Sequence, residues 1–196
     1  MKNRMKNLSV ALFLAAFAAG CTSAPSRFYT LNSTATGDGA ANSNVAVIVG
    51  PVSIPAQVDR PQFTVQVAPN RAAVDEFNRW AAPLSDNIAR VVAGNLSVLL
   101  GTPHVAALSA ANFNSAYRVT ISVQRFETVP GKSVLVDAVW VVRPPSGGAA
   151  QSGRTVASEP VSEESYDALA AAHSRALAKV SSDIAAAIQA GAESKP

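Results

Sequence analysis

Two stretches of the chain repeat apolar residues at the spacing of an α-helix. The first follows Pro83, and its stripe comprises Leu84, Ile88, Val91, Val92, Leu96, Leu99 and Leu100. Proline is favoured at the first position of a helix and glycine just beyond its end, so Pro83 and Gly101 predict the limits of this helix. The second covers residues 162–189, with the stripe Tyr166, Leu169, His173, Leu177, Val180, Ile184 and Ile188. Ser162 is its candidate cap, and the two glutamates that follow suit the positive end of the helix dipole.

Elsewhere the pattern has the two-residue period of β-strands. The predicted strands occupy residues 45–49, 62–67, 74–80, 117–124, 134–142 and 154–161. Gly50-Pro51 marks the end of the first strand, and Pro130-Gly131 fits the centre of a type II turn that joins two strands into a hairpin. The sequence therefore predicts one α+β domain, a mostly antiparallel β-sheet covered by two main helices.

The first 20 residues have the layout of a secretory signal peptide. Basic residues at positions 2, 4 and 6 precede an uncharged apolar run at positions 8–19. This run is shorter than the roughly 20 apolar residues of a spanning helix. The single cysteine follows at once, in Ala18-Ala19-Gly20-Cys21, which resembles a bacterial lipobox. We expect Cys21 to be the acylated first residue of the mature protein; the alternative is an ordinary signal peptide followed by a chance cysteine.

Charge and composition narrow the function classes. The chain has 16 basic and 13 acidic residues, and the basic excess lies within residues 1–20, so the remainder is neutral. No basic patch suggests a nucleic-acid partner. Residues 21–44 are rich in small polar residues and predict a flexible tether with a short strand near residues 27–31. Residues 45–190 are the expected domain, and residues 191–196 a frayed end.

No set of residues indicates catalysis or a cofactor. His104 lies in a predicted helix-to-strand loop and His173 on a helix stripe, and neither has a histidine or cysteine at metal-ligand spacing. Acylation of Cys21 would leave no thiol for a disulfide or a metal. A G-x-S-x-G motif is absent, although a catalytic triad assembles in space rather than in sequence. We expect no enzyme activity, no cofactor and no metal.

Several segments, taken in order, resemble the ABC-type transport auxiliary lipoproteins. They are Arg27-Phe28-Tyr29-Thr30-Leu31, residues 49–55 with Asp59-Arg60-Pro61-Gln62, Arg79-Trp80-Ala81-Ala82-Pro83-Leu84 with residues 86–90, and residues 95–101. The resemblance implies a lipid-anchored protein on the periplasmic face of the outer membrane. It would dock or hold the outer end of an MCE-domain periplasmic component of an ABC-type lipid transport system and so preserve membrane integrity. Thr22 agrees with this location, because an Asp in its place is the familiar inner-membrane retention signal.

The candidate partner-binding residues are Asp59, Arg60, Pro61, Gln62, Arg79 and Trp80. Each group also has a structural interpretation. Residues 59–61 form a turn in which Asp59 caps backbone N–H groups and Arg60 pairs locally, and Trp80 fills core beneath a helix. A second function class stays open, a structural envelope lipoprotein that binds peptidoglycan or an outer-membrane assembly machine. Homo-oligomerisation is a further expectation to test.

Overall fold

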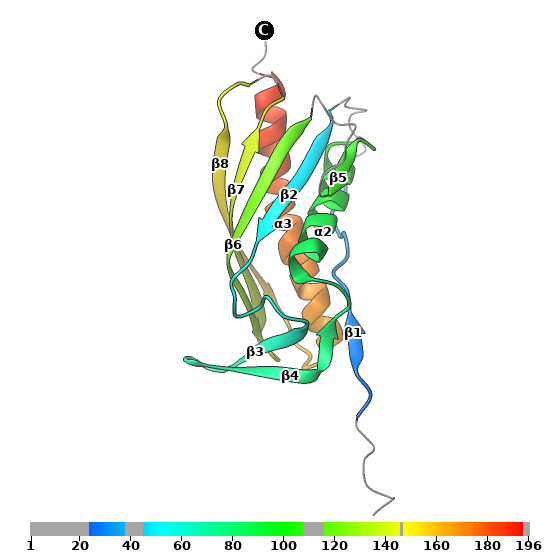
Figure 1. Ribbon diagram of the computed structural model, residues 1–196, viewed down its shortest axis with the longest axis vertical. Coiled ribbons are helices and arrows are strands. Elements are labelled where there is room, and N and C mark those ends of the chain that lie inside the picture. Colours follow the sequence, from blue (N-terminus) through cyan, green and yellow to red (C-terminus); the bar gives the residue numbers. More distant parts are fainter. Residues whose placement is uncertain (1–23, 38–44, 108–115, 146, 194–196) are drawn as a thin grey trace, which may run out of the picture.

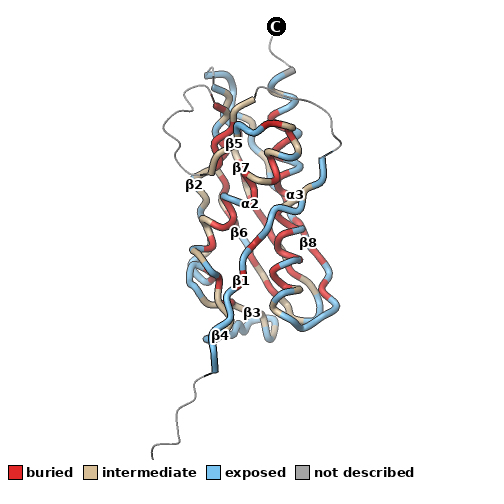
Figure 2. Tube along the Cα trace, turned by 90° about the vertical axis from the view of Figure 1, so that its right-hand side faces the viewer, coloured by how far each residue is buried: buried red, intermediate tan, exposed pale blue. Residues whose placement is uncertain are grey.

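The computed structural model describes residues 24–37, 45–107, 116–145 and 147–193. Helices α2 (Leu84–Leu99) and α3 (Tyr166–Glu193) pack on one face of a five-stranded sheet (Figure 1). Its strands, in the order β5-β2-β6-β7-β8, are β5 (Val105–Ala107), β2 (Val47–Ser53), β6 (Tyr117–Val129), β7 (Ser133–Arg143) and β8 (Gln151–Pro160). Buried residues line the faces where helices and sheet meet, as the red segments of Figure 2 show.

A second, three-stranded sheet lies across the lower end of the molecule in Figure 1. It has the order β1-β4-β3, with β1 (Arg27–Tyr29), β4 (Arg71–Trp80) and β3 (Gln62–Ala68). The expected α+β single domain with two main helices is confirmed, but both sheets are mixed rather than purely antiparallel. The parallel pairs are β1–β4, β2–β5 and β2–β6, and the antiparallel pairs are β3–β4, β6–β7 and β7–β8.

Both predicted helices form, with one shifted start. Helix α2 follows Pro83, its predicted stripe is buried except at half-buried Leu99, and Gly101 takes the left-handed conformation (φ 60°) of a helix end. Helix α3 begins at Tyr166, so Ser162 is not its cap. The amide of Val161 still donates to the Lys132 carbonyl (2.8 Å), which keeps this part of the chain in the sheet. Ser165 caps instead, its hydroxyl accepting a hydrogen bond from the Ala168 amide (3.2 Å).

Each predicted strand forms, with shifted ends, and strand β5 was not predicted. Strand β2 continues through Gly50-Pro51, where the register shifts as in a β-bulge. Proline is tolerated there because a bulge leaves a residue outside the ladder of hydrogen bonds. The β6–β7 hairpin turns at Gly131 (φ 66°), and the Lys132 amide donates to the Val129 carbonyl (3.1 Å), as a type II turn requires.

The described part of the expected tether, residues 24–37, lies against the domain. Strand β1 pairs with β4, and buried Asn95 of α2 holds the segment that follows. The Asn95 Oδ1 atom accepts hydrogen bonds from the Ser33 hydroxyl (2.6 Å) and from the amides of Thr34 and Ala35 (3.0 Å each). Its Nδ2 donates to Ser181 of α3 (3.2 Å). This stretch is therefore part of the fold, not a spacer.

Aromatic rings join the two sheets and α3. Trp80 stacks on Phe63 with ring centroids 4.0 Å apart, and Tyr166 of α3 meets Phe63 edge-on at 5.1 Å. The Tyr166 hydroxyl donates to Asp75 (2.7 Å), which also accepts bonds from Asn78. Although burial raises it, these hydrogen bonds hold the pKa of Asp75 at about 2. The three-stranded sheet is thus fixed to the body of the molecule.

Candidate functional site

The first wall of the site is the connection between β2 and β3. Its turn is closed by backbone hydrogen bonds from the Val58 and Asp59 amides to the Pro55 carbonyl (3.0 and 3.2 Å). The Val58 side chain is buried, which draws the loop onto the core and leaves Asp59, Arg60 and Pro61 exposed at the surface. Among the described residues, the Asp59 carboxylate accepts no hydrogen bond from a backbone amide and Arg60 forms no local ion pair. The structural interpretation of these two residues therefore lacks the bonds that it requires.

The second wall is the short connection between β4 and α2. The Trp80 amide donates to the Pro61 carbonyl (2.6 Å) and so ties the two walls together. The next amide, of Ala81, donates to the Tyr29 carbonyl of β1 (2.9 Å). At the start of α2, the Asn87 side chain donates to the Ala82 carbonyl (3.3 Å). The β4 end of this connection is therefore held by backbone hydrogen bonds and the α2 end by the Asn87 side chain.

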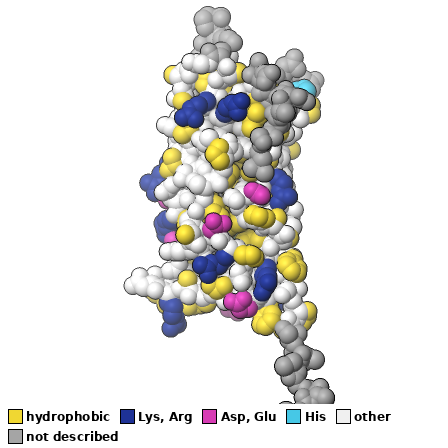
Figure 3. Space-filling view, in the orientation of Figure 1, with side chains coloured by type: hydrophobic (Ala, Val, Ile, Leu, Met, Phe, Trp, Pro, Cys, Tyr) yellow, Lys and Arg dark blue, Asp and Glu magenta, His cyan; other side chains and the backbone are white. Residues whose placement is uncertain are grey.

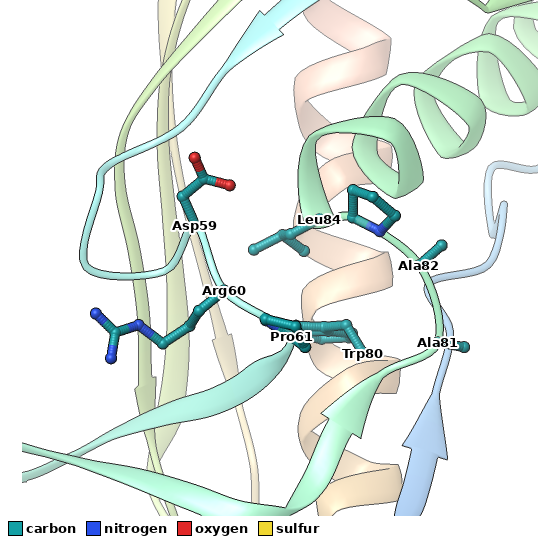
Figure 4. A pocket seen from close by; sticks show the side chains of 8 residues that line it. Asp59, Arg60, Pro61, Trp80, Ala81, Ala82 and Leu84 are labelled. Atoms are coloured by element: carbon teal, nitrogen blue, oxygen red, sulfur yellow. The ribbon is translucent and has the colours of Figure 1, made fainter.

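Between the walls lies a pocket of about 390 Å³, which we call the β2–β3 pocket. Pro61, Trp80 and Leu84 form much of its apolar lining, and Asp59 and Arg60 lie on one side, where the Arg60 side chain points away from these apolar residues (Figure 4). Its complete lining is Asp59, Arg60, Pro61, Trp80, Ala81, Ala82, Pro83 and Leu84. These residues include no hydroxyl, thiol or imidazole group. The pocket suits an apolar side chain that carries, or lies next to, a charged or polar group.

The structure brings four of the six candidate residues together at this pocket: Asp59, Arg60, Pro61 and Trp80. Gln62 and Arg79 lie apart from it. They face each other across β3 and β4, and both bind Glu76. Gln62 Nε2 donates to the Glu76 carboxylate (3.2 Å), while Arg79 Nε donates to the Glu76 carbonyl (2.8 Å).

Trp80 is not an exposed anchor residue. Its side chain is only 5% exposed and is enclosed by Phe63, Phe126 and His173. The structural interpretation of Trp80 as core is therefore correct, and its edge contributes only the floor of the pocket. Leu84, which the sequence placed on the core stripe of α2, contributes to the pocket in the same way.

Sequence reasoning missed a second hollow beside the first. It measures about 450 Å³, shares Ala81 and Ala82 with the β2–β3 pocket, and is bounded by residues 30–33 of the N-terminal segment and by Asn87, Arg90 and Val91 of α2. No local sequence pattern indicates this hollow, because its walls lie far apart in sequence. The pairing of β1 with β4 brings them together.

The two histidines lie outside the β2–β3 pocket. His173 is fully buried and stacked on Phe126, and His104 is exposed in its loop. In the part of the chain that the structure describes, no group of three or more His, Cys, Asp or Glu side chains is placed to hold a metal. Over the same residues, no helix has the length and apolarity to cross a membrane. Cys21 and the signal peptide lie outside the described residues.

Two crystal structures share this fold. One, described as an uncharacterized protein, has a TM-score of 0.71 and 18% identity, and the match covers 84% of this chain and 99% of that one. The other, protein XCC0632 from Xanthomonas campestris, of the family DUF330, has a TM-score of 0.70 and 21% identity, with 87% and 100% covered. No curated protein matches the sequence. A family model described as ABC-type transport auxiliary lipoprotein component matches residues 29–185, which include both walls of the pocket.

Proposed function

Because the chain belongs to the family of ABC-type transport auxiliary lipoprotein components, we propose that it binds the MCE-domain periplasmic protein of such a transport system through the β2–β3 pocket. In this proposal the protein is held on the periplasmic face of the outer membrane by lipid at Cys21. It keeps the outer end of the periplasmic component close to that membrane, where lipid is exchanged.

The observation that carries the proposal is the position of two charged groups at the rim of an apolar pocket. Asp59 and Arg60 are exposed, and neither side chain has a hydrogen-bond or ion-pair partner among the described residues. Their charges are therefore available to a partner. An arginine can make a forked contact to a carboxylate, and Pro61 limits the freedom that the loop would lose on binding.

The pocket has the make-up of an interface centre. Buried apolar lining surrounded by polar groups is typical of the places where one or two residues supply most of the binding energy. Both of its walls lie within residues 49–101, where the resemblance to the family is strong. The mature chain is neutral overall, so a local patch rather than a long-range field should determine the partner.

The test compares two variants with the wild type for binding to the MCE-domain protein. Arg60→Ala removes the rim cation and should weaken binding by about 1–3 kcal/mol. Ala81→Trp fills the pocket from its exposed lining and should abolish binding. Arg118→Ala is the matched control, since Arg118 is an exposed arginine of β6 outside this pocket.

Thermal unfolding is measured beside binding. All three variants should unfold near the wild-type temperature, because exposed side chains without partners contribute little to stability. Unchanged binding by Arg60→Ala and Ala81→Trp would remove the pocket from the interface. Absence of binding by wild-type protein, acylated and non-acylated alike, would refute the proposal and favour a structural role on peptidoglycan or an outer-membrane assembly machine.

A further inference from the structure

The exposed apolar side chains of the protein are concentrated at one end. Six large hydrophobic residues are exposed among those that the structure describes, and four of them belong to the three-stranded sheet. These four are Phe28 (65% exposed), Val67 (48%), Val74 (38%) and Phe77 (43%). In Figure 3, hydrophobic side chains lie at the lower end of the molecule, with basic and acidic groups among them. Single exposed apolar residues are ordinary, but a cluster of them indicates a contact surface.

Strand register places Phe28 on the side of the three-stranded sheet that faces away from the body. Tyr29 pairs with Trp80 and both are buried, so this pair points inward. The preceding pair, Phe28 and Arg79, must then point outward, because successive side chains of a strand alternate between its faces. Between Arg79 and Asp75 the register of β4 shifts, and Phe77, within this irregular stretch, is exposed. Asp75 points inward to Tyr166 of α3, so its neighbour Val74 points outward. We call this side, with Phe28, Phe77 and Val74, the outer face of the three-stranded sheet.

The outer face is held rigidly. The Asp75 carboxylate accepts hydrogen bonds from the amides of Phe77 and Asn78 (2.9 Å each) and fixes the backbone that carries the Phe77 ring. Tyr29 donates to the Asn78 side chain (2.8 Å), which locks β1 onto β4 beside Phe28. The rings are therefore presented by an ordered backbone and not by a loose loop, which lowers the entropy lost on contact.

The length of chain before the described residues defines what this face meets. Ala24 is the first described residue, and the chain enters β1 at the lower end of the molecule (Figure 1). Only three residue steps separate Ala24 from Cys21, and three residues span at most about 11 Å. An acyl group on Cys21 therefore cannot reach a bilayer unless this end of the protein lies close to it.

We infer that the outer face of the three-stranded sheet rests on the membrane that holds the lipid anchor, with Phe28 and Phe77 inserted among the lipid headgroups. The inference rests on the anchor at Cys21 in the proposed function, but not on the protein partner. Phenylalanine rings are suited to this depth, and interfacial binding strengthens with the apolar area buried there. Arg27 and Arg71, exposed on the same sheet, can keep their charged ends at phosphate level while their stems lie along the surface.

The test places an environment-sensitive fluorophore at single sites in the acylated full chain, reconstituted into vesicles of phosphatidylethanolamine and phosphatidylglycerol. Phe28→Cys and Phe77→Cys carry the label, since acylation consumes the thiol of Cys21, the only native cysteine. Val156→Cys is the matched control, because Val156 is exposed on β8 of the other sheet. Nitroxide lipids in the bilayer quench any label that reaches it.

Labels at positions 28 and 77 should shift to shorter wavelength and be quenched, and the label at position 156 should stay in water. A second measurement uses the non-acylated Cys21→Ser chain and the same vesicles. The double substitution Phe28→Ser and Phe77→Ser should lower its partitioning about tenfold, while Val156→Ser leaves it unchanged. These substitutions are at exposed sites, and thermal unfolding confirms that the variants fold.

Three results would overturn the inference. Labels at 28 and 77 that remain unquenched on an acylated, vesicle-bound chain would show that the face does not touch lipid, while the proposed anchor and partner stand. Labels that become buried only when the MCE-domain protein is added would assign the face to a protein interface. Mass spectrometry showing an unmodified Cys21 in the mature protein would refute the anchor, and the inference would fail with it.

Discussion

Replacing His173 by glutamine should remove most of the dependence of folding stability on pH between about pH 7.5 and pH 5. His173 is fully buried and stacks on Phe126 with ring centroids 3.9 Å apart. Its Nε2 lies 2.8 Å from the Thr128 hydroxyl oxygen, whereas Nδ1 has no partner among the described residues. A protonated imidazole carries an N–H on both nitrogens, and one of them would then be buried without an acceptor. Burial accordingly lowers the pKa of His173 to about 3.

The size of the effect follows from this shift. A histidine in the unfolded chain has a pKa of about 6.5. Below that pH the unfolded state binds a proton that the folded state refuses, so stability is complete above about pH 6.5 and falls as the pH approaches 3. The slope approaches about 1.4 kcal/mol per pH unit, and lowering the pH from 7.5 to 5 should cost about 2 kcal/mol.

The buried carboxylates do not contribute to the change in stability between pH 7.5 and pH 5. Hydrogen bonding to Arg154 lowers the pKa of Asp137, and, against the effect of burial, Lys179 and Arg175 lower the pKa of Glu159. Their stabilising contribution is present above the unfolded pKa values of about 4 and is lost only as the pH falls below them. At pH 5 both groups therefore still stabilise the fold.

Urea unfolding at the two pH values, followed by tryptophan fluorescence, measures the effect. With a slope near 2 kcal/mol per molar urea, the wild-type midpoint should fall by about 1 M at pH 5. His173→Gln keeps a group able to bind Thr128 and should show nearly equal midpoints. His104→Gln, at the other histidine, should behave like the wild type. An equal loss in wild type and His173→Gln would refute the reasoning, because another group would then be titrating.

Three further predictions test packing and anchoring. Leu96→Ala in the buried stripe of α2 should lower the free energy of unfolding by about 2–5 kcal/mol, whereas Val98→Ala on the exposed side should change it by less than about 0.5 kcal/mol; equal effects would contradict the core assignment. Asn95→Ala removes the acceptor of three hydrogen bonds and should cost about 2–4 kcal/mol, with faster hydrogen exchange at the amides of residues 34 and 35; unchanged exchange would show that these bonds do not hold the segment. Cys21→Ala should prevent lipid attachment and leave uncleaved precursor, as mass spectrometry of the membrane fraction can establish.

Local patterns predicted the helices and the β6–β7 hairpin because each depends on residues close in sequence. The apolar stripe from Leu84 to Leu100 requires only that one face of the helix be buried. The conformation of Gly131 depends only on the turn that contains it. The predicted start of α3 was wrong because a serine suited to capping a helix occurs at both position 162 and position 165. Tertiary hydrogen bonding of Val161 in the sheet, invisible in the sequence, selects Ser165 over Ser162.

Non-local pairing explains what the sequence did not show. Strand β1 joins β4 in parallel across about fifty residues, and β5 joins β2 in the same way, so neither sheet is built from sequence-adjacent strands alone. The pocket has the same origin. Asp59-Arg60-Pro61 and Trp80 were singled out separately, and the β3–β4 hairpin that returns Trp80 to Pro61 brings them together. Because successive side chains of this hairpin alternate between its faces, Gln62 and Arg79 lie apart from the pocket.

The backbone hydrogen bonds connect the proposed membrane face to the proposed binding pocket. Tyr29 of β1 accepts a bond from the Ala81 amide, and the Trp80 amide donates to the Pro61 carbonyl, so a continuous path joins the strand nearest Cys21 to both pocket walls. Asn95 holds the chain that follows β1 against both helices. A short tether and a rigid path leave the pocket little freedom to turn away from the bilayer. A partner bound there would be kept beside the membrane by the fold itself, without any moving part in this chain.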